Sequence, residues 1–88
     1  MDMQYYREQI DAIDDKILPL FKERMSVVRQ IALYKKENNL PALDVARETE
    51  KLAVIDEKAS GELCPYAHKL YAFLFELSRE YQEGILHE

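Results

Sequence analysis

Two cationic side chains stand on a helix face that is otherwise apolar. Alternating spacings of four and three residues define a seam that consists of Tyr6, Ile10, Ile13, Ile17, Leu20, Arg24, Val27, Ile31 and Tyr34. Lys35 follows Arg24 by about three helical turns and so returns to nearly the same face. Because an unpaired buried charge is very costly, Arg24 predicts an anionic partner. That partner is either a glutamate of the protein or an anionic ligand, whereas Lys35 alone is also compatible with a solvated lysine near a helix end.

A second group of polar side chains lies in "PALDVARE" and in "LSREYQ". Asp44 and Glu48 are four residues apart and share a helix face, with Arg47 beside them. The amino end of a helix disfavours a cation, so Arg47 stands against its local preference. Asp44 also fits an ordinary helix N-cap. Ser78 and Gln82 share a face of a later helix, where ordinary surface polarity is the alternative interpretation.

The elements that must position these residues are all helical. The seam predicts one long helix over about residues 3–38, kinked at Pro19, because a mid-helix proline costs about 3 kcal/mol and usually bends a helix. Further helices are predicted over about 44–58 and 65–83, with Gly61 ending the first of them. The predicted apolar stripe of the last helix consists of Leu70, Phe73, Leu74, Leu77 and Tyr81. The sequence therefore predicts an all-α fold in one domain, residues 1–88.

The predicted first helix is too long for a compact domain of 88 residues. About 36 helical residues span roughly 54 Å, whereas a globule of this length has a diameter near 30 Å, from a radius of gyration near 12 Å. The helix would project from its own domain with its seam exposed. We therefore expect a second copy of the chain to cover the seam in an intertwined, two-fold homodimer.

Composition excludes several classes of function. The net charge of −5 argues against binding to nucleic acid or anionic lipid. The single cysteine, Cys64, cannot form an internal disulfide, which suits a reducing compartment. No apolar run approaches the roughly 18 residues of a membrane span, and the start lacks the layout of a signal peptide. We expect a cytoplasmic protein. Only two glycines are present, so no phosphate-binding loop can be built from them.

Four stretches together resemble one known family. "YREQIDAIDDKI", "ERMSVVRQIALYKKENN", "PALDVARE" and "LSREYQ" are similar to the signature segments of the all-helical chorismate mutases, the AroQ class or type II. These also occur fused to prephenate dehydratase or dehydrogenase in bifunctional proteins. The resemblance covers about residues 6–82 and implies a three-helix chain in an intertwined dimer. Two residues depart from a simple match: Pro19 is not part of the family pattern, and Arg79 follows Ser78 where an apolar neighbour would also be acceptable.

The resemblance implies the reaction and the residues that support it. Chorismate, a dicarboxylate, rearranges to prephenate when one C–O ether bond breaks and one C–C bond forms. The reaction needs no nucleophile, proton transfer, metal or cofactor. Prephenate serves phenylalanine and tyrosine biosynthesis in the shikimate pathway. The implied site residues are Arg7 from the partner subunit and, from the same chain, Arg24, Lys35, Asp44, Arg47, Glu48, Ser78 and Gln82.

Within this implied site, one group of residues would bind the carboxylates of the substrate and another would act on its ether oxygen. Arg7 and Arg24 would grip the two carboxylates through paired guanidinium donors, and Ser78 could add a hydroxyl contact. Lys35 and Gln82 would donate to the ether oxygen as negative charge grows on it.

The remaining implied residues hold the ring of the substrate. Glu48, with Asp44, would bind the ring hydroxyl. Arg47 would order both carboxylates and add positive potential to the site. Two alternatives stay open at this point: an isochorismate–pyruvate lyase of the same fold, and a non-catalytic helical dimer in which Arg24 pairs with a protein carboxylate.

Overall fold

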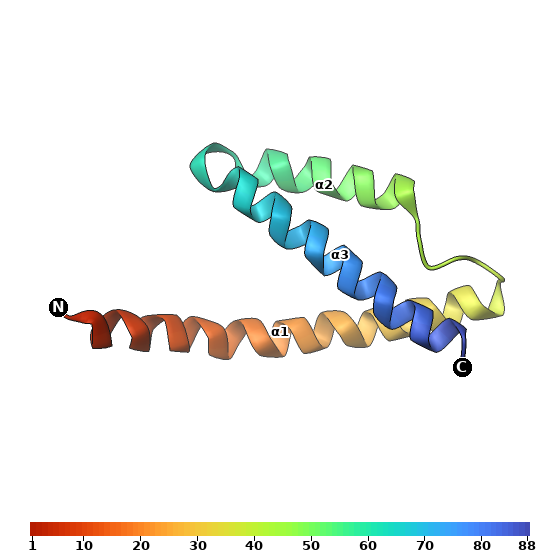
Figure 1. Cartoon of the computed structure of the whole chain (residues 1–88), viewed down its shortest axis with the longest axis horizontal. Helices are drawn as coiled ribbons and strands as arrows, with labels where there is room; N and C mark the ends of the chain where they lie inside the picture. Colours follow the sequence, from red (N-terminus) through yellow and green to blue (C-terminus); the bar gives the residue numbers. More distant parts are fainter.

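The computed structural model describes all residues, 1–88, and contains helices without any strand (Figure 1). In chain order the elements are α1 (Met3–Glu37), α2 (Val45–Ala59), the short 3₁₀ helix η1 (Gly61–Leu63) and α3 (Cys64–Leu86). The all-α class and the three predicted helices are confirmed. The sequence did not predict η1, and α3 continues three residues beyond its predicted end.

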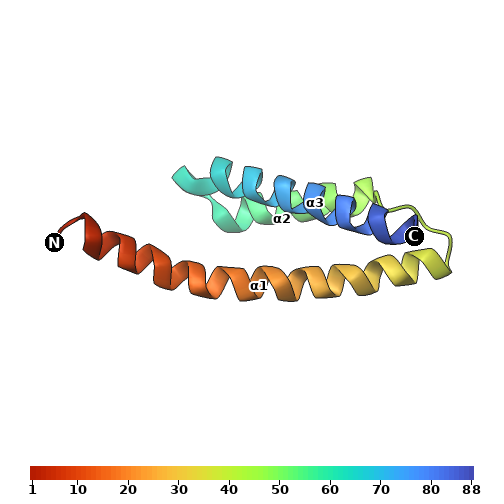
Figure 2. The same ribbon diagram turned by 60° about the horizontal axis from the view of Figure 1, so that its bottom comes forward.

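The first helix runs without interruption through Pro19. Its N-cap is Asp2, whose side chain accepts a hydrogen bond from the backbone N–H of Tyr5 at 3.0 Å. The ribbon bows gently and shows no sharp bend in either view (Figures 1 and 2), so the predicted kink is not observed. The proline leaves the carbonyl of Asp15 without its helical partner. Because this part of α1 is exposed, water can bind that carbonyl.

The two shorter helices begin and end at residues suited to those positions. Asp44 caps α2 by accepting a hydrogen bond from the backbone N–H of Arg47 at 3.0 Å, which confirms the N-cap interpretation. Gly61 lies just beyond the end of α2 with φ 72°, a left-handed conformation that glycine adopts without a side-chain penalty. Pro65 lies in the first turn of α3, where its missing N–H costs no helical bond.

The three helices leave a large part of α1 uncovered. α2 and α3 diverge from the η1 turn, and the C-terminal part of α3 crosses the C-terminal half of α1 (Figure 1). The other half of α1 projects away from both helices (Figure 2). The chain measures 55 × 27 × 14 Å, with a radius of gyration of 16.2 Å against the value of about 12 Å expected for a compact chain of this length.

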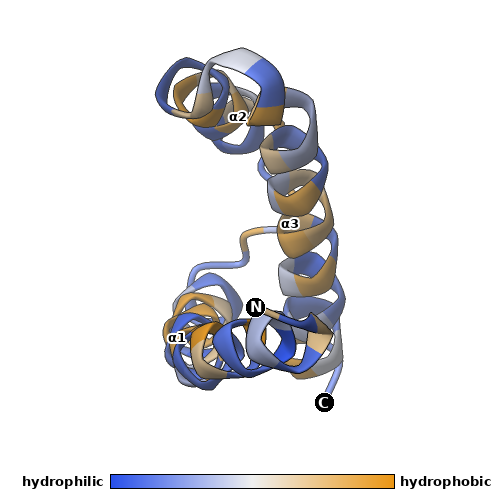
Figure 3. Cartoon of the chain, turned by 90° about the vertical axis from the view of Figure 1, so that its left-hand side faces the viewer, coloured by the Kyte–Doolittle hydropathy of each residue, from blue (hydrophilic) through white to orange (hydrophobic).

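Very little of the chain is buried. Only 8 of 88 residues are buried, and the surface of 7074 Å² exceeds the value of about 5,400 Å² typical of a compact monomer of this mass. Many large hydrophobic residues of α1 and α3 are exposed, and Figure 3 shows hydrophobic stretches on both helices. None of the helices combines the length and apolar composition that a membrane crossing requires. The buried residues are Val28, Ala32, Ala42, Ile55, Phe75, Ser78, Gln82 and Ile85.

The predicted apolar stripe of α3 is largely uncovered in the single chain. Leu70, Phe73 and Tyr81 are exposed, while Leu74 and Leu77 are half-buried. The buried face of α3 instead contains two polar residues. The reason is geometric: α3 meets α1 and α2 on the face that carries Ser78 and Gln82, and no other helix of the chain covers the more apolar face.

Candidate active site

A pocket of about 260 Å³ lies where all three helices come together. Its walls come from the C-terminal half of α1, the loop before α2, the first turns of α2 and the C-terminal half of α3. Its apolar lining is Val28, Ile31, Ala42 and Phe75. It brings together seven of the eight predicted site residues: Arg24, Lys35, Asp44, Arg47, Glu48, Ser78 and Gln82.

Lys35 is held in place by two hydrogen bonds, so the interpretation of a solvated lysine is wrong. Its Nζ donates to the carbonyl of Ala42 at 2.7 Å and to Oε1 of Gln82 at 2.8 Å. One of the three ammonium protons is left without a partner in the chain. Because Gln82 accepts through its oxygen, its amide NH₂ also remains available. Gln82 is 6% exposed, so it is not the surface residue that its polarity alone suggested.

Arg24 pairs with no carboxylate of the chain. Its Nη1 donates to Oγ of Ser78 at 2.6 Å, and its guanidinium carbon lies 5.8 Å from the centre of the Phe75 ring. Oγ of Ser78 in turn donates to the carbonyl of Leu74 at 2.8 Å. Ser78 is buried. Its single hydroxyl proton is already used, and its oxygen orients Arg24. The structural ion pair with a glutamate, which the non-catalytic interpretation predicted, is absent from the chain.

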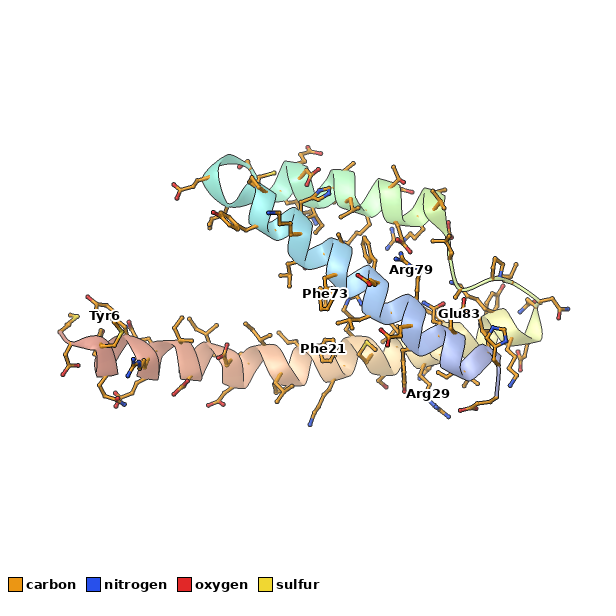
Figure 4. The ribbon with its side chains drawn as sticks, in the orientation of Figure 1. Tyr6, Phe21, Arg29, Phe73, Arg79 and Glu83 are labelled. Atoms are coloured by element: carbon orange, nitrogen blue, oxygen red, sulfur yellow. The ribbon has the colours of Figure 1, made fainter.

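The two carboxylates of α2 are held by different partners. Asp44 is occupied as the N-cap, whereas Glu48 forms an ion pair through Oε1 with Nη1 of Arg79 on α3. Figure 4 shows Arg79 extending from α3 towards the start of α2. The guanidinium of Arg47 makes no hydrogen bond within the chain, so the expectation that Arg47 orders both carboxylates is wrong for this structure. Arg79 orders Glu48 instead.

Two pocket residues were missed by the sequence interpretation. Arg79 and Lys51 both line the pocket. Lys51 follows Asp44 and Glu48 at the four-then-three spacing of a single helix face, so the periodicity used for α1 would have found it. Arg79 gave a weaker signal, because it was noticed only as a charged neighbour of Ser78.

The pocket is positively charged although the chain is negative. Five cationic side chains and two carboxylates line it, which gives a formal charge of +3 in a chain whose net charge is −5. A concave, partly apolar site with one sign of charge concentrates ligands of the opposite sign. The geometry therefore favours a small anion with an apolar body. No group of His, Cys, Asp and Glu side chains is arranged to hold a metal ion.

Arg7 is the one predicted site residue that the single chain does not bring to the pocket. It lies 17 positions before Arg24 on the same continuous helix, which places it roughly 25 Å away along the axis. It is exposed and makes no hydrogen bond within the chain. Its neighbour Tyr6 marks this distant end of α1 in Figure 4.

Comparison with known proteins gives one match. A family model described as chorismate mutase type II matches residues 6–83, which includes all eight predicted site residues. No curated protein and no solved structure matches the chain.

Proposed function

The chain belongs to the chorismate mutase type II family, a family of isomerases, and from this premise we propose that it converts chorismate to prephenate for phenylalanine and tyrosine biosynthesis. The single observation that carries the proposal is the placement of Arg24 and Lys35 in one pocket without a carboxylate partner. Two fixed cations of this kind suit an anionic ligand. The proposed protein is a cytoplasmic domain of residues 1–88 that needs no cofactor or metal.

The first task of the proposed site is to hold an extended dianion in a compact, reactive shape. Arg24 would bind one carboxylate, because Ser78 and the Phe75 ring fix its guanidinium while other N–H groups remain free. Ser78 thus contributes mainly through Arg24. Arg47, whose guanidinium has no partner in the chain, would add positive potential at the mouth of the pocket.

The second task is to stabilise negative charge on the ether oxygen as the C–O bond breaks. Lys35 has one free ammonium proton and Gln82 has a free amide NH₂, and the hydrogen bond between them fixes both. Donors that are fixed before the reaction need no reorganisation in the transition state. Such donors are typically worth about 2.7–4 kcal/mol each. Glu48, with Asp44 beside it, would accept a hydrogen bond from the ring hydroxyl and position the ring.

The exposed seam of α1 supports the proposed intertwined homodimer. Its spacings from Tyr6 to Arg24 are four, three, four, three and four, so the pattern reads the same in both directions about residue 15. An antiparallel copy centred there would place Ile10 against Leu20 and Ile13 against Ile17. The same register brings Arg7 of the second copy alongside Arg24. Arg7 would then complete the site by binding the second carboxylate.

The proposed function is tested by incubating the purified protein with chorismate and following its conversion to prephenate. Incubation with isochorismate in parallel detects the alternative lyase, which would release pyruvate. We expect prephenate formation that is unaffected by a metal chelator. Absence of turnover on chorismate, with pyruvate released from isochorismate, would replace the mutase proposal with the lyase.

Gln82→Glu is expected to make activity depend on acid. At neutral pH the introduced carboxylate would pair with Lys35 and repel charge growing on the ether oxygen, so kcat/KM should fall about 100-fold. When protonated, the same group can donate a hydrogen bond in place of the amide. Activity of the variant should therefore rise as the pH falls, while wild type stays nearly flat. Rates measured from about pH 8 to about pH 5 test this.

The matched control for this experiment is Gln30→Glu. It makes the same chemical change on an exposed part of α1 outside the pocket, and its pH profile should follow that of wild type. A flat profile for Gln82→Glu would show that Gln82 does not face the reacting oxygen.

A further inference from the structure

The ion pair between Arg79 and Glu48 joins two walls of the pocket. Glu48 lies in the first turns of α2, and Arg79 lies on α3. Their side chains are 22% and 32% exposed, respectively, so the pair is partly shielded from water. Only Oε1 of Glu48 is bonded to the arginine, and no other side chain of the protein bonds to Oε2. One carboxylate oxygen therefore stays available at the pocket.

We propose that Arg79 is a positioning residue that sets the preference of the pocket for a ligand hydroxyl. It does so by fixing Glu48, so that the free carboxylate oxygen of Glu48 accepts a hydrogen bond from that hydroxyl. The inference rests on the proposed function, in which Glu48 meets the ring hydroxyl of a dicarboxylate. It assigns to Arg79 no contact with the reacting atoms.

The charges around Glu48 explain why it needs to be held. Lys51 follows it by three residues on the same helix, a spacing at which a glutamate and a lysine can pair. Lys35 and Arg24 line the opposite wall. A glutamate released from Arg79 would rotate towards these cations and would no longer present a fixed acceptor. Asp44 is a poor replacement, because the hydrogen bond from the backbone N–H of Arg47 to its Oδ1 holds that carboxylate at the start of α2.

The consequence is a change in selectivity rather than a general loss of binding. A hydrogen bond to a charged acceptor is typically worth about 1.5–3 kcal/mol, or roughly tenfold or more in affinity. Wild type should bind a hydroxylated dicarboxylate about tenfold more tightly than the same molecule without its hydroxyl. In Arg79→Met this ratio should shrink to about twofold. A loss of general stability would lower the affinity for both ligands alike and leave the ratio of the two affinities unchanged.

The experiment uses calorimetry with two probes, a bicyclic dicarboxylate transition-state analogue that carries the ring hydroxyl and its deoxy counterpart. Arg79→Lys keeps the charge but not the planar fork of donors, so its ratio should lie between those of wild type and Arg79→Met. The matched control is Lys51→Met, which removes the same charge from the same pocket. It should weaken the binding of both probes while keeping the tenfold ratio of their affinities. Thermal melting by circular dichroism checks that each variant folds.

Glu48→Ala tests whether Arg79 acts through Glu48. This variant should show the same small ratio as Arg79→Met, and the double variant should show no further loss. An unchanged ratio in Arg79→Met, or a further drop in the double variant, would overturn the inference. If Arg79→Met fails to fold, an Arg79→Lys ratio equal to that of wild type would do so.

The same measurements separate this inference from the proposed function. A protein that binds the dicarboxylate probes but does not convert chorismate would refute the mutase activity, while the ratios would still decide the role of Arg79. A wild type that binds neither probe would overturn both.

Discussion

Lys35→Met should lower kcat/KM for chorismate by about 100- to 1000-fold while the chain stays helical. The substitution keeps the length and packing of the stem but removes the ammonium group that bonds to Ala42 and Gln82. It leaves two buried acceptors without a partner, so some stability is also lost, about 1–3 kcal/mol for each. The loss of rate in the folded variant reflects the missing donor to the ether oxygen.

Lys36→Met is the matched control. Lys36 is adjacent on α1, carries the same charge, and donates to the carbonyl of Ile85 at 3.4 Å, but it does not line the site pocket. Its kcat/KM should stay within about threefold of wild type, because it removes charge without removing a donor in the site. Steady-state kinetics and thermal melting of both variants decide the matter. Equal losses in the two variants would mean that Lys35 acts only through net charge or stability.

Arg7→Ala and Lys35→Ala should each be almost inactive alone yet regain activity when refolded together. If Arg7 enters from the neighbouring chain, each site draws Lys35 from one subunit and Arg7 from the other. Random pairing makes about half of the dimers mixed, and each mixed dimer has one intact site and one doubly damaged site. The equal mixture should therefore recover about a quarter of wild-type activity.

The control for subunit mixing is each variant refolded alone, which should recover almost no activity. Mass spectrometry of differently tagged chains measures how many mixed dimers form. A mixture that contains mixed dimers but stays as inactive as its parents would show that Arg7 and Lys35 do not meet across the interface.

The fold was predictable from sequence where local rules decide it. The four-and-three spacing of α1, the cap at Asp44 and the left-handed Gly61 each follow from nearby residues. The bend predicted at Pro19 is not observed, because in an exposed helix water can bind the carbonyl that a proline leaves without a partner. Periodicity identified the apolar stripe of α3, including Phe73, but could not show that the single chain leaves most of it exposed.

The site was predictable to the extent that polar residues interrupt an apolar pattern. Arg24 and Gln82 were singled out in this way, and both line the pocket. Their partners were not predictable, since the contact between Arg24 and Ser78 spans 54 residues of sequence. The same limit applies to Arg79, whose pairing with Glu48 depends on how α2 and α3 are placed relative to each other. The roles of these residues remain predictions that the kinetic experiments test.

The small number of buried residues also bears on how this protein keeps its shape in dilute solution. Ordering each residue costs about 1–2 kcal/mol in backbone entropy, and a lone chain with six buried hydrophobic residues has little to offset that cost. In the proposed dimer, folding and association would then be a single equilibrium, so the melting temperature would rise with protein concentration. A cell that makes too little of the chain would lose more than a proportional share of its activity, because the folded population falls with dilution.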